Sequence, residues 1–233
     1  MYWEQSPDAD ARSVPDHIID LSYRLSGRAV PLDHAWALRQ AVIDRLPWMA
    51  DEAGCGIHQI HVASSGNGWL RPERDGDAII HMSRRTRLVL RIPKTRYDDA
   101  QALVGGTLHL GSDCRIGVGV AAVKPLSALT TVFSRYVVSG AEETESDFTE
   151  RVAHSLRHDL AVRPRKLLCG SVSTIRTPNS DLRTRQVFLS DLDHDESIRL
   201  QQHGLGPDRL LGCGLFIPHK GIAPVAAADS GPA

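Results

Sequence analysis

Alternation of apolar and polar side chains predicts the first strand of this chain at 19–25, because a period of two is typical of a half-buried strand. Apolar residues then recur at helical spacing over 33–49. Asp33 is the expected N-cap of this helix, and Pro47 is expected to kink or end its last turn. Glycines at 54 and 56 close the segment.

The same reading predicts the rest of the first half. We expect strands at 57–62, 86–92, 108–110 and 116–118 and a short helix at 96–104, with a glycine-containing hairpin turn at 111–113. In the strand at 86–92, Leu88, Leu90 and Ile92 face one way, whereas Arg87 and Arg91 face the other.

The order strand, helix, strand, strand, helix, strand then recurs. We expect strands at 132–138, 167–175, 183–189 and 215–217, and helices at 147–160 and 193–200. Asp147 with Glu150, and Asp193 with Glu196, have the spacing of capping boxes at the two helix starts.

This repeated order predicts an α+β fold of tandem ferredoxin-like (βαββαβ), RRM-like units. We expect an N-terminal domain at 17–124 and a C-terminal domain at 128–220 that carries a glycine-rich loop. The segments 1–16 and 223–233 are expected to be loose termini.

Composition excludes several classes of protein. The 233 residues are 42% apolar and 24% charged, which is ordinary for a globular chain. No apolar run has the length of a membrane span, and the N-terminus lacks the features of a signal peptide, so a cytoplasmic location is expected. The net charge of −1 does not favour nucleic-acid binding, which would therefore require local segregation of charge.

The cysteines and histidines do not predict a metal or cofactor. The 4 cysteines form no Cys-x-x-Cys pair, which argues against a zinc knuckle or disulfide framework. His154 and His158 lie four apart on a predicted helix, but no third ligand accompanies them.

Basic residues cluster around two predicted strand regions. Arg87 and Arg91 belong to the first cluster, and Arg183 and Arg185 belong to the second. Guanidinium groups on one strand face can pair with RNA phosphates, although ion pairs on a solvated sheet face are an equal alternative. Only 5% of residues are aromatic and no aromatic set is expected on the strands, which argues against base stacking.

The most specific stretch lies near the C-terminus. Gly204-Leu205-Gly206 and Gly212-Cys213-Gly214 bracket five residues that include Arg209. Paired glycines let a backbone approach a ligand or another chain segment closely. The stretch is no nucleotide P-loop, because no Gly-Lys-Ser/Thr follows and the loop leads into a strand.

This double-glycine loop and its flanks resemble those of the precursor-crRNA endoribonucleases, of the CRISPR repeat-associated RNA-binding superfamily, in particular the myxococcal-type form. The resemblance implies cleavage of CRISPR repeat RNA without metal, by attack of a 2′-hydroxyl on the adjacent phosphate. The expected partners are precursor and mature crRNA and other subunits of a CRISPR effector complex.

The resemblance also implies site residues. A histidine on or just after the first helix would act in catalysis, which selects His34 and His58 and, more weakly, His61. Arg209 is the first choice for phosphate contact. The remaining expected RNA-binding residues are Gly204, Gly206, Gly212, Gly214, Lys220, Arg87, Arg91, Arg183 and Arg185.

Two other functions remain open at this point. One is a non-cleaving RNA-binding subunit of a CRISPR effector complex, in which the histidines are structural. The other is a ferredoxin-like regulatory module that binds a small molecule, since such units host many functions.

Overall fold

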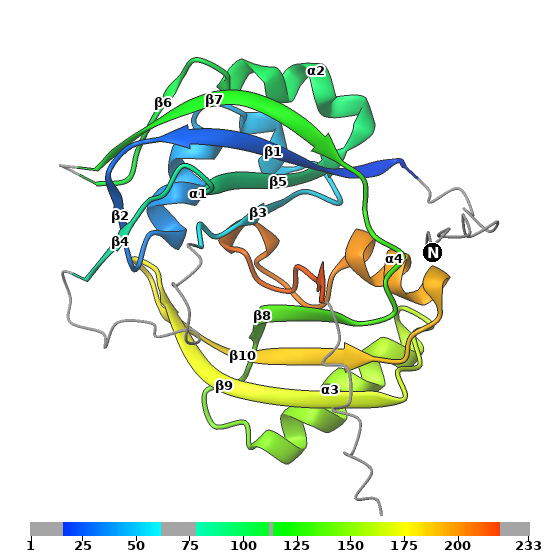
Figure 1. Ribbon diagram of the computed structural model, residues 1–233. Helices are drawn as coiled ribbons and strands as arrows, with labels where there is room; N and C mark the ends of the chain where they lie inside the picture. The colour runs from blue at the N-terminus through cyan, green and yellow to red at the C-terminus, as the bar shows by residue number, and fades with distance from the viewer. Residues whose placement is uncertain (1–15, 62–77, 112–113, 220–233) are drawn as a thin grey trace, which may run out of the picture.

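The structure, a computed structural model, describes residues 16–61, 78–111 and 114–219 (Figure 1). Two antiparallel sheets lie one above the other, with helices α1 and α2 beside the upper sheet and α3 beneath the lower one. The fold class predicted from the sequence is confirmed. Among the described residues, no helix is long and apolar enough to cross a membrane.

The first sheet has the order β3-β5-β1-β7-β6 in the described part of the chain. Its strands are β1 (Ile18–Ser26), β3 (Gly56–His58), β5 (Arg87–Pro93), β6 (Thr107–His109) and β7 (Arg115–Lys124). Alternation places Leu21 and Tyr23 in the core, whereas Asp20 points to the opposite face. The predicted pairing of these two strands is confirmed, since Leu108 lies opposite Ile116, whereas residues 112–113 of the expected turn lie outside the described residues.

Helices α1 (Ala35–Ile43) and α2 (Tyr97–Ala100) cover the core face of this sheet. Short 3₁₀ turns η1 (Pro47–Ala50), η2 (Lys94–Arg96) and η3 (Gln101–Leu103) flank them. The predicted first helix is too long: it begins after His34, without a side-chain cap, and Pro47 starts a separate turn. Proline cannot continue the helical hydrogen bonds, which explains the break.

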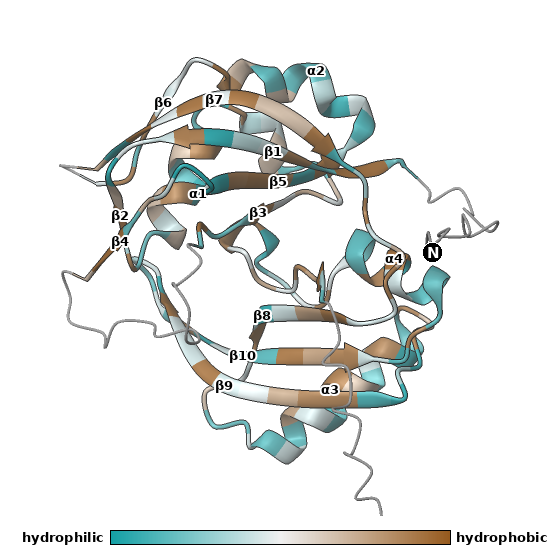
Figure 2. Ribbon diagram, in the orientation of Figure 1, coloured by the Kyte–Doolittle hydropathy of each residue, from teal (hydrophilic) through white to brown (hydrophobic). Residues whose placement is uncertain are grey.

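The second sheet has the order β11-β8-β10-β9 among the described residues. Its strands are β8 (Val132–Val138), β9 (Lys166–Arg176), β10 (Asp181–Ser190) and β11 (Ile217–Pro218). Helices α3 (Glu145–His158) and α4 (His194–His203) belong to this half, and the turn η4 (Arg209–Leu211) precedes β11. In Figure 2, β1, β5 and β10 carry hydrophobic stretches, whereas α2 and α4 carry hydrophilic ones.

The two predicted helix caps of this half have different outcomes. Asp193 and Glu196 form the predicted capping box at the start of α4. The prediction for α3 is wrong, because Thr144 is the N-cap and its side chain accepts a hydrogen bond from the Asp147 amide. Threonine three residues before an aspartate caps as well as the predicted pair, so the spacing alone did not distinguish them.

One small ribbon was not predicted. β2 (Ala29–Pro31) pairs with β4 (Ile79–His81), with Ala29 opposite His81. Three residues are too few to show a period of two, so neither strand could be recognised from its pattern.

The connection between the halves is packed. Leu126 is buried with Ile18 and Ile198, and the side-chain amide of Gln201 donates to the Ser127 carbonyl and accepts from the Ser127 N–H. The proposed domain limits at 17–124 and 128–220 stay a prediction.

Candidate active-site cleft between the two sheets

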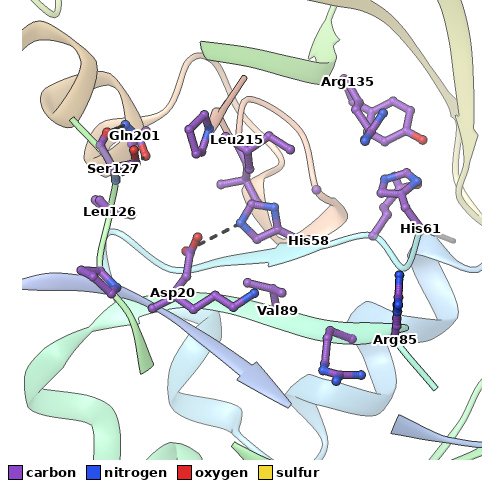
Figure 3. A pocket seen from close by; sticks show the side chains of 18 residues that line it. Asp20, His58, His61, Arg85, Val89, Leu126, Ser127, Arg135, Gln201 and Leu215 are labelled. Carbon is purple, nitrogen blue, oxygen red and sulfur yellow. Dashed lines mark hydrogen bonds and ion pairs between the residues drawn. The ribbon is translucent and has the colours of Figure 1, made fainter. Parts of the chain in front are cut away.

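A cleft of about 430 Å³ lies between the two sheets (Figure 3). β1, β3, β5 and β7 contribute to its wall from the first half, and β8, α4 and β11 contribute from the second. The side chains with chemistry in this wall are Asp20, His58, His61, Arg85, Arg87, Lys124, Arg135 and Tyr136.

His58 is the last residue of β3. The pairing of β3 with β5 puts His58 opposite Val89 and turns its ring into the cleft. Its Nε2 lies 3.8 Å from Asp20 Oδ1, which is beyond hydrogen-bond distance (Figure 3). This nitrogen is buried and has no hydrogen-bond partner among the described residues.

Asp20 is held in place by Arg91, its direct neighbour across the β1–β5 pair. The guanidinium donates to both carboxylate oxygens, at 2.8 Å and 2.9 Å. Burial alone would raise the pKa of Asp20, but the charge of Arg91 and its two hydrogen bonds outweigh this effect and hold the pKa well below its usual range. Asp20 is therefore a fixed negative charge beside His58.

The His58 environment favours the neutral ring. Burial lowers the pKa of His58 below its usual value, and the positive charges of Arg91 and Arg209 act in the same direction, while Asp20 opposes them. A neutral imidazole with an unpaired nitrogen can accept a proton near neutral pH.

His34 has a structural environment that speaks against the predicted catalytic role. Only 2% of the residue is exposed. Its Nδ1 lies 2.8 Å from the Pro31 carbonyl, and its Nε2 accepts a hydrogen bond of 2.9 Å from the Ile60 N–H. Both ring nitrogens thus have backbone partners, which tie the start of α1 to the end of β2 and to the segment just after β3.

His61 is the third histidine considered from the sequence. Its ring stacks on Tyr136 with 6.0 Å between centroids and 22° between planes. It lines the cleft from the same chain segment as His58. The sequence analysis ranked His61 lowest of the three histidines. In the structure His61 lines the cleft that holds His58, whereas His34 does not.

The cleft wall is strongly cationic. Arg85, Arg87, Lys124 and Arg135 line it, and the carboxylate that the described residues contribute, that of Asp20, is paired with Arg91. Arg87 was predicted to bind RNA, and it lies here with one guanidinium nitrogen on the Arg84 and Thr86 carbonyls. Lys124 and Arg135 were not singled out from the sequence, because single basic residues gave no cluster signal there.

Arg91 cannot reach a ligand in this structure. It is 0% exposed, and besides Asp20 it donates to the carbonyls of Gln201 and Phe216. The geometry therefore favours a structural role for Arg91, which joins the first sheet to the segments around α4 and β11.

The glycine-rich loop packs mainly on its own chain. Arg209, the first choice for phosphate contact, donates instead to the carbonyls of Gly54, Cys55, Gln202 and His203. Burial lowers the pKa of Arg209 to about 10. These contacts speak against a phosphate-binding role for Arg209.

The four loop glycines differ in exposure. Gly204, Gly212 and Gly214 are buried, and Gly206 alone is exposed at the loop tip. Gly212 lines the cleft, and a Cβ there would lie 2.9 Å from the Gln59 side chain. The loop thus fixes the strand that carries His58 rather than lying open along its whole length.

Arg183 and Arg185 point away from the cleft. Arg183 donates to the Gly140, Ala141 and Glu143 carbonyls, and Arg185 pairs with Glu145 at the start of α3. The geometry gives both residues structural partners. Lys220, the remaining predicted contact, lies outside the described residues.

Metal ligands are not gathered in the described part of the chain. His154 and His158 stack with 4.3 Å between ring centroids, and no group of three metal-ligating side chains occurs among the described residues.

Comparisons with known proteins identify the family. The family model described as Cas6 Crispr matches residues 19–221. The CRISPR-associated endonuclease Cas6 of Myxococcus xanthus (strain DK1622) is 26% identical over 200 residues, which cover 86% of this chain and 81% of that protein.

Solved structures agree on the fold. A CRISPR associated protein Cas6 superposes with a TM-score of 0.62 at 14% identity, over 87% of this chain and 100% of that one. A Cas6-related protein from Pyrococcus furiosus gives 0.58 at 11% identity, over 85% and 97%. The CRISPR endoribonuclease Cse3 bound to a 19 nt RNA gives 0.50 at 10% identity, over 85% and 96%.

The match to the family model spans most of the chain and confirms the family predicted from the glycine-rich loop. This protein belongs to the Cas6 family of CRISPR proteins.

Proposed function

We propose that this chain is a metal-independent endoribonuclease that cleaves CRISPR repeat RNA to mature crRNA, with His58 as the catalytic base. The observation that carries the assignment is a neutral His58 in a cationic cleft, whose Nε2 lies near Asp20 and has no hydrogen-bond partner in the described part of the chain. The reaction takes place in the cytoplasm, and the enzyme stays with its product as part of an interference complex.

The proposed reaction needs one proton acceptor and no metal. His58 Nε2 takes the proton of a ribose 2′-hydroxyl, and the resulting oxygen attacks the adjacent phosphorus. The P–O5′ bond breaks, and the leaving oxygen takes a proton from water. The products are a 2′,3′-cyclic phosphate and a 5′-hydroxyl, and His58 is left as an imidazolium.

The neighbours of His58 suit this reaction. Asp20, at 3.8 Å, stabilises the imidazolium once it forms. The cations of the cleft, Arg85, Arg87, Lys124 and Arg135, hold the RNA backbone and oppose the charge that develops on the phosphate. Asp20 is a positioning residue, because it acts through His58 and not on the RNA.

End-labelled repeat RNA from the protein's own locus tests this proposal. The RNA is incubated with the protein in EDTA, beside a substrate with one 2′-deoxy at the cleavage position. We expect cleavage in EDTA, none at the 2′-deoxy, and about 10²- to 10⁴-fold slower cleavage by His58→Gln.

His154→Gln, a change on the distant surface helix α3, is the matched control and should cleave at the wild-type rate. RNA that binds tightly but stays whole would overturn the proposal and favour the non-cleaving RNA-binding subunit. Binding of a small molecule without affinity for the RNA would favour the regulatory module.

A further inference from the structure

We propose that the open face of the second sheet is a stacking platform for unpaired RNA bases. This inference rests on the proposed function and adds a binding subsite to it. The platform is a row of apolar side chains that crosses all four described strands of the sheet, namely Ile217, Phe133, Phe188 and Leu168.

Strand register places these side chains together. Phe133 lies directly opposite Ile217 on one side and Phe188 on the other, and Phe188 lies opposite Leu168. Residues directly opposite each other in an antiparallel pair project from the same face of the sheet. The neighbouring positions Val132 and Leu189 are 0% exposed and pack into the core on the α3 side, so the row faces away from that core.

The side chains of this row are partly or largely exposed to solvent, unlike those of the core. Phe133 and Phe188 are half-buried, and Leu168 is 61% exposed. Phe133 and Phe188 line a cavity of about 660 Å³, which has the size of pockets that hold small organic molecules. Ser171, Ser173 and Gln186 supply polar groups at its edge that can bond the edge of a base.

His219 completes the platform. Its ring meets Phe133 and Phe188 edge to face, with centroid distances of 5.6 Å and 5.2 Å, and its backbone N–H donates to the Thr131 carbonyl. Its Nδ1 is buried and has no hydrogen-bond partner among the described residues. A bound base would supply the missing partner.

Charge favours RNA over an apolar peptide as the occupant. The Arg135 guanidinium lies 4.8 Å from the centre of the Phe133 ring. Arg135, Tyr136 and His61 line both this cavity and the cleft that holds His58, so the two spaces adjoin. A strand whose backbone follows the cationic cleft therefore passes directly to the aromatic rings, which is how single-stranded RNA is bound elsewhere.

The expectation that the strands carry no aromatic set is thus wrong. Phe133 and Phe188 are 55 residues apart and each is the only phenylalanine of its strand. Only the pairing of β8 with β10 brings them side by side.

The test compares RNA affinities of the whole protein. The probe is repeat RNA from its own locus, made uncleavable by a 2′-deoxy at the cleavage position. The double variant Phe133→Leu with Phe188→Leu keeps apolar bulk and removes both rings. We expect roughly 5- to 150-fold weaker binding per base lost from the platform, with an unchanged salt dependence.

Val172→Ala is the matched control. Val172 is exposed on the same sheet, but it lies opposite Arg185, which points toward α3. Its affinity should equal that of the wild type. Wild-type affinity in the double variant would overturn the platform.

A second measurement does not depend on the folding of a variant. Single abasic sites are placed along the RNA, and one should weaken binding to the wild type but not to the double variant. Absence of any such position would also overturn the platform. The proposed cleavage is tested separately. It would be refuted if the cleavable RNA stayed intact after incubation with the wild type in EDTA, whatever the binding measurements show.

Discussion

The α-carbon of Gly214 lies against the backbone of Leu205, so closely that a Cβ on Gly214 would stand 2.1 Å from the Leu205 carbonyl oxygen. The Leu205 N–H donates to the Gly214 carbonyl at 3.0 Å, and Gly214 itself donates to the Tyr136 carbonyl at 2.6 Å. The double-glycine motif therefore closes the loop on itself and attaches it to β8.

Gly214→Ala is expected to destabilise the fold severely, by more than about 3 kcal/mol, because the methyl group would collide with backbone that cannot move freely. Gly206→Ala is the control. Gly206 has a similar positive φ of 77° but has open space around it, so it should cost only about 1–2 kcal/mol. Denaturant unfolding of both variants gives the comparison, and equal losses would contradict the packing argument.

Asp20→Asn is expected to cost about 3–5 kcal/mol of folding stability, because it leaves the fully buried Arg91 charge without its carboxylate. In the wild type this stabilisation is present above the usual carboxyl pKa of about 4 and is lost as pH falls through the lower folded pKa. Asp99→Asn, at the exposed pair with Arg96, should cost less than about 1 kcal/mol. Similar melting temperatures for the two variants would refute the difference.

The pH dependence of cleavage should follow His58. Since burial lowers the pKa of His58, the acidic limb of kcat/KM should lie below about pH 6.5, the ordinary value for histidine. Rates measured at subsaturating RNA report the free enzyme. The limb should disappear from the residual activity of His58→Gln, and an unchanged limb in that variant would assign it to another group.

The free energy of unfolding should also decrease at acidic pH because of His58. The folded chain binds a proton on His58 less readily than the unfolded chain does, so stability falls as pH drops below about 6.5. His58→Gln should remove this part of the pH dependence of the unfolding free energy.

Arg209→Ala is expected to lower stability by about 3 kcal/mol, because several partly buried carbonyls lose their donor. Its RNA affinity should keep the wild-type salt slope, since the guanidinium contacts backbone and no phosphate. Arg85→Ala, at an exposed cleft residue, should do the reverse: wild-type stability and a salt slope reduced by about 1. A reduced slope in Arg209→Ala would restore its predicted phosphate contact.

The fold could be predicted because its signals are local. A period of two over 19–25 and helical spacing in α3 and α4 depend only on nearby residues, and the repeated order of elements then selects the topology. The errors lie at helix starts, because His34 and not the expected Asp33 is the N-cap of α1, and Thr144 and not Asp147 is the N-cap of α3. The ribbon β2–β4 was not predicted because its strands are too short to show a period.

The site was less predictable because it depends on register between distant strands. Asp20 gave no signal as a lone aspartate, and only the β1–β5 pairing places it opposite Arg91 and near His58. His34 and His58 looked alike from the sequence. They differ because the Ile60 N–H donates to His34 Nε2, whereas His58 Nε2 has no hydrogen-bond partner among the described residues.

The arginines illustrate the same limit. A strand pattern shows which face Arg91 takes, but not that the second half of the chain covers that face with the carbonyls of Gln201 and Phe216. Arginines that were predicted to contact phosphate instead donate hydrogen bonds to the protein's own backbone carbonyls.

Arg91 also couples the unfolding of the two halves of the protein. It is rooted in the first sheet, yet two of its acceptors belong to the second half, and Gln201 binds the connecting segment through Ser127. If the second half melted alone, a buried charge in the first would lose part of its hydrogen bonding. The two cores should therefore unfold in one cooperative transition, and the repeated architecture would behave calorimetrically as a single folding unit.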